Sequence, residues 1–174
     1  MFSVLQATLL AVFPALMIVA GLRDLTSYTI PNWISAILVL AFAPVALACG
    51  LPASQIGLHL VIGLGALVAA MGMFALGWIG GGDAKVFAAA ALWLGWPGTA
   101  VFLMVTTLAG GALALGLLAI RSDWLRTHTP LTVPGWTHRL MRDGEAAPYG
   151  VAIAIGALAA WPSAALMATF HGIL

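Results

Sequence analysis

Charged residues are scarce in this chain of 174 residues: Asp, Glu, Lys and Arg make up 6% of it, whereas hydrophobic residues make up 63%. A soluble domain devotes about a quarter of its residues to charge, so water cannot be the solvent for most of this protein. The formal net charge is +1, which provides no basic field for nucleic acid. We therefore expect the lipid bilayer itself to be a partner of this protein, and we expect it not to bind nucleic acid.

Cysteine and histidine are also rare. The single Cys49 permits no internal disulfide and no CxxC metal site, so we expect it to be a small core side chain. His128 and His138 have no carboxylate at metal-ligand spacing, and neither a metal nor another cofactor is expected. His59 lies in an apolar run, where a buried, hydrogen-bonded ring is a simpler interpretation than a proton relay.

Long apolar runs occur at residues 2–22, 33–49, 55–79, 83–96, 99–120 and 148–170. About 20 apolar residues cross the ~30 Å hydrocarbon core of a bilayer as a helix. These runs predict an all-α membrane protein, a bundle of about six transmembrane helices. We expect residues 1–174 to form a single integral-membrane domain. The first run lacks a basic region before it and is interpreted as a retained helix.

The basic residues all fall in odd-numbered connections between the runs; they are Arg23, Lys85, Arg121, Arg126, Arg139 and Arg142. The positive-inside rule assigns these connections to the cytoplasm. Both termini are then on the non-cytoplasmic side of the cell inner membrane, and the hydrophilic segment 121–147 is cytoplasmic. Tryptophans near the predicted span ends are consistent with interfacial anchors; they are Trp33, Trp78, Trp93, Trp96, Trp124 and Trp136.

Only five acidic residues are present. Asp123, Asp143 and Glu145 stand among arginines in the hydrophilic segment, where solvated surface charge is the expected role. Asp24 and Asp83 instead lie at the cytoplasmic ends of apolar runs, where an ionised side chain is costly without a partner or water.

The predicted topology places Asp24 and Asp83 on the same face of the bilayer. Two carboxyl groups at short range share one proton. The ionised member can then activate water while the protonated member donates to a scissile carbonyl oxygen. Peptide hydrolysis by such a pair requires no cofactor.

Structural roles are open for the same residues. Asp24 follows Arg23 and could simply mark the membrane boundary. Asp83 could serve as a helix N-cap, and Lys85 could pair with it. The glycines at residues 80–82 give the backbone freedom to approach an extended peptide or let Asp83 reorient, but they would also suit a plain turn.

Three segments resemble the motifs of the type IV prepilin peptidases, a family of membrane aspartyl proteases. Gly80-Gly81-Gly82-Asp83-Ala84-Lys85 is similar to the family's GxGD-x-K signature, and the run from Asp24 to Ile30-Pro31-Asn32 is similar to its other aspartate motif. Pro148-Tyr149-Gly150 resembles the Pro-aromatic-Gly found at the head of the last span.

This resemblance implies a protease that removes the short leader of prepilin-like proteins at the cytoplasmic membrane face. The substrate would carry a basic leader followed by a hydrophobic helix, with cleavage at their junction. Asp24 and Asp83 match the catalytic aspartates, and Gly80 and Gly82 match the motif glycines. The remaining matches imply supporting roles for Lys85, Pro31 and Asn32.

The chain departs from the longer members of that family, which carry paired CxxC motifs associated with N-methylation. It is more similar to the short peptidases of Flp or tight-adherence pili, so methylation is not expected; archaeal preflagellin peptidases remain possible relatives. Two other classes stay open: a small ion- or proton-coupled transporter subunit, with aspartates at a helix break, and a non-catalytic scaffold of a secretion assembly. The oligomeric state is not predicted.

Overall fold

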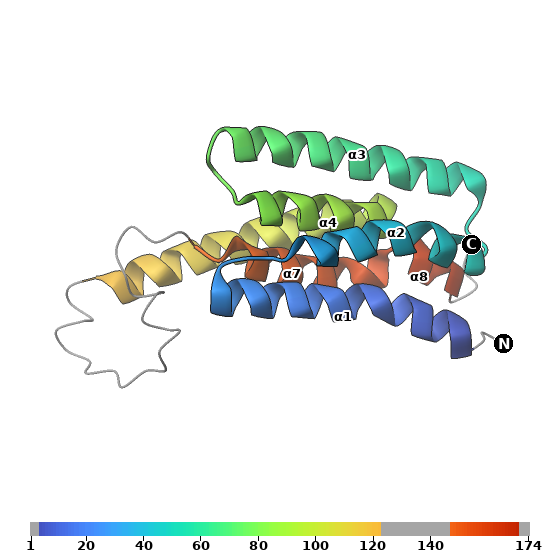
Figure 1. Ribbon diagram of the computed structural model, residues 1–174, viewed down its shortest axis with the longest axis horizontal. Helices are drawn as coiled ribbons and strands as arrows, with labels where there is room; N and C mark the ends of the chain where they lie inside the picture. The colour runs from blue at the N-terminus through green and yellow to red at the C-terminus, as the bar shows by residue number, and fades with distance from the viewer. Residues whose placement is uncertain (1–3, 123–146, 171–174) are drawn as a thin grey trace.

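The computed structural model describes residues 4–122 and 147–170, and within these ranges every regular element is a helix. The elements are α1 (Val4–Ser27), α2 (Asn32–Ala48), α3 (Ala53–Ala75), α4 (Gly81–Arg121), α7 (Tyr149–Ala160), the 3-10 turn η1 (Trp161–Ser163) and α8 (Ala165–Phe170). They form an elongated bundle in which α4 contacts α2, α3 and α7, and α1 packs on α2 and α7 (Figure 1). The all-α prediction is confirmed.

Several helices suit a bilayer. In the part of the chain that the structure describes, four stretches are long and apolar enough to cross a membrane: Val4–Ser27, Ala53–Ala75, Gly81–Arg121 and Tyr149–Thr169. Helix α2 is apolar but shorter, with 17 residues. Large apolar side chains such as Leu40, Leu64 and Leu108 are exposed on the outer faces of these helices, as a hydrocarbon solvent requires. The protein is therefore a multi-pass membrane protein, while the count of six spans and the side of the termini stay predictions.

Helix α4, given above as one stretch, consists of two helical halves that form a hairpin. The backbone leaves the helical region at Gly95 (φ 57°) and Trp96, and the Thr99 hydroxyl donates to the Ala91 carbonyl at 3.3 Å. Residues eight apart would be separated by ~12 Å along a straight helix, so the chain folds back here. Figure 1 shows the second half running back past the start of the first. The halves correspond to the predicted runs 83–96 and 99–120.

His59 lies at this reversal and is fully buried. Its Nδ1 hydrogen-bonds to the Leu92 carbonyl at 2.7 Å, and a Cβ at Gly95 would overlap its ring. The expectation of a buried, hydrogen-bonded histidine is confirmed. Because the ring occupies the space beside position 95, only glycine fits the turn.

The predicted end of the first span is wrong. Helix α1 does not stop at residue 22 but continues through Asp24 to Ser27. The hydroxyls of Thr26 and Ser27 donate to the carbonyls of Leu22 and Arg23, each at 2.7 Å, so these polar residues satisfy themselves within the helix. Asp24 is therefore part of the last turns of α1 and does not follow it.

Three other boundaries differ from the prediction. Helix α3 ends at Ala75 because Gly77 adopts φ 74° and Trp78 N–H returns to the Met73 carbonyl at 3.0 Å, the geometry of a glycine C-cap. The last run is broken at η1, where Pro162 lacks the N–H that a continuous helix needs. Helix α2 starts at Asn32, with Pro31 as its N-cap.

Trp93 is not an interfacial anchor. It is fully buried, its indole N–H donates to the Leu38 carbonyl at 2.8 Å, and its ring stacks on Phe13 with centroids 5.5 Å apart. Trp33, Trp78 and Trp96 are exposed, and their role as interfacial anchors stays a prediction. Trp124 and Trp136 lie outside the described residues, as does most of the predicted hydrophilic segment with Asp123, Asp143, Glu145, His128 and His138. Cys49 is half-buried against the core.

Four chain segments meet at one end of the bundle. They are the last turn of α1, the connection 28–31, the first turn of α4 and the first turn of α7 (Figure 1). The first turn of α1 and the short helix α8 lie at the opposite end. Both predicted aspartates belong to the first of these ends.

Candidate active site

Asp24 is held by the N-terminus of α7. Its side chain is 4% exposed, and its Oδ2 accepts the Gly150 N–H at 2.7 Å. The amide of Val151 also hydrogen-bonds to this carboxylate. The first N–H groups of a helix have no partner within the helix and carry partial positive charge, so α7 forms a preorganised anion site around Asp24.

Glycine at position 150 is a steric requirement of this contact. An added Cβ would lie 2.8 Å from Asp24 Oδ2, 2.9 Å from Asp24 Cβ and 2.7 Å from Ile30 Cδ1. One turn earlier on α1, a Cβ at Gly21 would lie 2.9 Å from that of Ala154. Small residues on both helices let the backbones approach closely, which brings the carboxylate within reach of the α7 amides.

Asp83 is held by a local contact. It is the third residue of α4 and is 9% exposed, and its Oδ2 accepts the N–H of Gly80 at 3.3 Å. This is the reach-back half of a capping box. Asp83 therefore occupies position N3; the possibility that it is the N-cap is wrong, because Gly80 takes that place.

Ile30 connects the two aspartates. Its side chain is buried and would touch a Cβ at Gly150, and its Cβ and carbonyl oxygen would each lie 3.2 Å from a Cβ at Gly82. The first turns of α4 and α7 are thus packed on the same residue. The carboxyl groups of Asp24 and Asp83 are near enough to interact electrostatically, and two negative charges in a buried site repel each other.

Lys85 does not form the pair with Asp83 that the sequence allowed. Its Nζ instead donates to the Asn32 Oδ1 at 2.9 Å. Pro31 is the N-cap of α2 with φ −62°, which sets Asn32 at the start of that helix. The hydrogen bond between Lys85 and Asn32 ties the first turn of α2 to the start of α4, next to Asp83.

All residues expected at the site are therefore at one end of the bundle: Asp24, Asp83, Gly80, Gly82, Lys85, Pro31 and Asn32. Ile30 was expected only as part of the aspartate motif and without a role, and the amides of Gly150 and Val151 were missed as parts of the site. Pro148-Tyr149-Gly150 was expected only as a resemblance to a family motif. A glycine directly after the predicted helix start at Pro148 is the signal that could have located these amides. Within residues 4–122 and 147–170, no group of three or more His, Cys, Asp or Glu could hold a metal ion.

Comparison with known proteins identifies the family. The profile of the type IV leader peptidase family matches residues 11–115, which make up more than half of the chain and include both aspartates. No curated protein and no solved structure matches the chain. Since the matched stretch contains the two aspartate motifs in order, the chain belongs to the type IV leader peptidase family and is a peptidase.

Proposed function

We propose that this protein is a membrane aspartyl endopeptidase in which Asp24 and Asp83 form the catalytic pair. The observation that carries the proposal is the convergence of two buried carboxyl groups, from α1 and α4, at one end of an apolar bundle. Like charges in such a site favour a shared proton. A pair in that state holds one general base and one general acid.

The hydrogen bonds favour Asp24 as the ionised member. It receives a 2.7 Å hydrogen bond from Gly150 and another from Val151, whereas Asp83 receives one at 3.3 Å from Gly80. Backbone N–H donors at a helix N-terminus stabilise a carboxylate. Asp83 then carries the proton of the pair.

The reaction follows from this assignment. Asp24 takes a proton from water, and the oxygen adds to the scissile carbonyl carbon while Asp83 gives its proton to the carbonyl oxygen. The tetrahedral intermediate collapses as the proton on Asp24 passes to the leaving nitrogen, the C–N bond breaks and Asp83 recovers its proton. One water is consumed, and the products are a carboxylic acid and an amine.

The proposed substrate is a prepilin-like protein with a basic leader followed by a hydrophobic helix. An active site at the end of the bundle, and not at mid-height, is supported by the position of Asp24 in the last turns of α1 and Asp83 in the first turn of α4. Arg23 and Lys85 lie beside them, and a basic end is assigned to the cytoplasm. We therefore propose cleavage at the cytoplasmic face of the inner membrane, by a short peptidase similar to those of Flp or tight-adherence pili.

The test is cleavage of a prepilin-like substrate in membranes, with wild type compared with Asp24→Asn and Asp83→Asn at matched expression. Asparagine keeps the size and much of the hydrogen bonding but cannot exchange the proton as a carboxyl group does. We expect both variants to insert normally and to lose cleavage. A variant that cuts at nearly the wild-type rate would show that its aspartate is structural, and the proposed catalytic pair would be wrong.

A further inference from the structure

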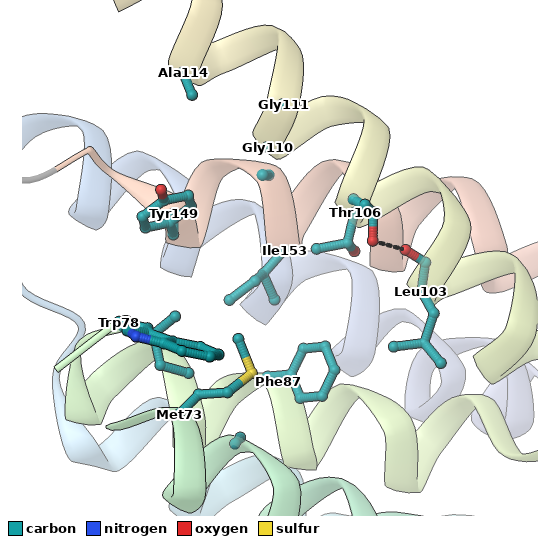
Figure 2. Close-up of a pocket in the computed structure, with 14 residues that line it drawn as sticks. Met73, Trp78, Phe87, Leu103, Thr106, Gly110, Gly111, Ala114, Tyr149 and Ile153 are labelled. Carbon is teal, nitrogen blue, oxygen red and sulfur yellow. Dashed lines mark hydrogen bonds between the residues drawn. The ribbon is translucent and has the colours of Figure 1, made fainter. Parts of the chain in front are cut away.

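An apolar groove begins beside the aspartate pair. Its volume is about 570 Å³, and it lies between the end of α3, both halves of α4 and the start of α7 (Figure 2). At one end is Tyr149, the residue directly before the Gly150 amide that holds Asp24. Phe87, one turn after Asp83, forms part of the wall. The groove therefore lies beside the proposed active site.

The second half of α4 contributes small residues to the groove. They are Thr106, Thr107, Gly110, Gly111 and Ala114, at helical spacing. Figure 2 shows Thr106, Gly110, Gly111 and Ala114 along one helix. Beside and beyond the groove, the same helix carries Leu108, Leu115 and Leu118, which are 68%, 70% and 67% exposed; Leu118 continues the row of Gly111 and Ala114 past the end of the groove. Large apolar side chains suit contact with lipid, whereas small and hydroxyl-bearing residues are enriched where membrane helices contact each other. The groove face is thus built for another helix.

Part of this face already packs on α7, because a Cβ at Gly156 would overlap Thr106 and a Cβ at Gly110 would lie 3.7 Å from the Cβ of Ala152. Within the described residues, Gly111 has no such partner. No described atom lies within 4 Å of a Cβ added at Gly111. From Leu103 to Ala114 the groove spans twelve residues of α4, which is ~18 Å or about three helical turns. A helix laid in a groove of this length presents anchors at i, i+4 and i+7.

A second groove, of about 630 Å³, lies between α2, α3 and the first half of α4. Its walls carry Val39, Leu40, Leu60, Leu64 and Leu67, large side chains of the kind that face lipid. It includes no residue of α1 or α7, so it does not reach the amides that hold Asp24. It does include Asn32 and Lys85, which lie next to Asp83, so both grooves approach the aspartates. The first groove is favoured because its described lining residues are uncharged and one of them, Tyr149, directly precedes the Gly150 amide that holds Asp24.

We propose that the groove beside Tyr149 binds the first three turns of the substrate's apolar helix, directly after the cleaved bond. This inference rests on the proposed peptidase function and adds the site that recognises the helix. With the helix in the groove, its N-terminal end lies at the aspartates, and the basic leader extends beyond the end of the bundle. Among the residues that the structure describes, none that lines the groove is charged, so it selects an apolar segment.

Two glycines of α4 provide a matched test. Gly111 lines the groove and Gly116 does not, and neither has a described atom within 4 Å of an added Cβ. Gly111→Phe fills the groove, whereas Gly116→Phe adds the same side chain outside it. Each variant is assayed on a prepilin-like protein with its helix and on a short soluble peptide that spans the cut and lacks the helix.

The readout is the ratio of kcat/KM for the two substrates. We expect Gly111→Phe to lower this ratio by about tenfold, a loss equivalent to about 1.4 kcal/mol of binding, and Gly116→Phe to leave it unchanged. Equal ratios in the two variants would overturn the groove while leaving the peptidase in place. If the wild type cleaves neither substrate, the proposed function itself fails.

Cross-linking tests the groove without catalysis. In a background that carries Cys49→Ala and Asp24→Asn, Gly111→Cys and Gly116→Cys are each combined with a substrate that has one cysteine in the first turns of its helix. We expect a disulfide to the substrate from position 111 and none from position 116. A disulfide from position 111 to a second copy of the chain, or equal substrate cross-linking at both positions, would overturn the inference.

Discussion

The two aspartates are held in different ways. Asp24 is bound by the amide of Gly150, 126 residues away in the sequence, at 2.7 Å. Asp83 is bound by the amide of Gly80, three residues away, at 3.3 Å. The first contact exists only when α1 and α7 are packed together, whereas the second belongs to the first turn of α4 itself. A tertiary contact thus sets one half of the pair and a local turn sets the other.

This difference has a consequence for the reaction. Short hydrogen bonds from a helix N-terminus stabilise a charge and fix its position. A single longer hydrogen bond from a glycine turn restrains Asp83 less and leaves it free to adjust to a carbonyl oxygen. The fixed carboxylate suits the base and the adjustable carboxyl group suits the acid.

The largest expected effect is the loss of cleavage when either aspartate is replaced, and its size should differ between the two positions. Asp24→Asn and Asp83→Asn should each lower cleavage by at least about a hundredfold, the scale of general acid–base catalysis, with the greater loss at Asp24. An amide at position 83 can still donate a hydrogen bond to the scissile carbonyl, but an amide at position 24 cannot take the proton from water. Residual rates in single-turnover assays measure the difference.

The pH profile provides an independent check of the same assignment. Wild-type activity should fall on the acid side as the base is protonated and on the alkaline side as the shared proton is lost, both limbs belonging to the coupled pair. The residual activity of Asp83→Asn should lack the alkaline limb. Equal residual rates together with unchanged limbs would contradict the asymmetry.

A smaller effect is expected from glycines that pack beside each aspartate. Gly150→Ala should lower cleavage by about a hundredfold, because a Cβ at 2.8 Å from Asp24 Oδ2 must displace the carboxylate, and a displacement of ~1 Å can cost that much. Gly82→Ala should cost only about tenfold on the same scale, since its nearest contacts, with Ile30, are at 3.2 Å.

Gly116→Ala is the control for both glycines, because nothing described lies within 4 Å of the added Cβ. Cleavage rates and thermal unfolding in detergent should be measured together for the three variants. A greater loss for Gly82→Ala than for Gly150→Ala would mean that Asp83, and not Asp24, is the more tightly positioned member.

The smallest effect is expected from breaking the hydrogen bond between Lys85 and Asn32, which lies beside Asp83. Lys85→Met removes the 2.9 Å hydrogen bond to Asn32, and a net contribution of ~0.5–1.5 kcal/mol corresponds to a loss of activity of a few fold. Asn32→Ala should have a similar effect, and the double variant should be no worse than either single one. Additive losses in this cycle would show that the two side chains act independently.

Much of the fold was predictable because bilayer solvation acts on each run of residues separately. The apolar runs located the helices, and the separate runs 83–96 and 99–120 correspond to the two halves of α4. The continuation of α1 through Asp24 was missed because polar residues at a span end read as a boundary, and only the structure shows their hydroxyls bonded back to the helix. Trp93 was misplaced because sequence position alone does not reveal which face of a helix is buried.

The sequence by itself determined the solvent, the helical class and the glycine turn that holds Asp83, since each depends on composition or on residues a few positions apart. Tertiary structure alone decided that the α7 amides bind Asp24, that Ile30 connects the aspartates and that an apolar groove lies beside them. These features depend on the distance between helices. That distance is set by how closely Gly21, Ala154 and Gly150 let two backbones approach, a property of side-chain packing between segments far apart in the chain.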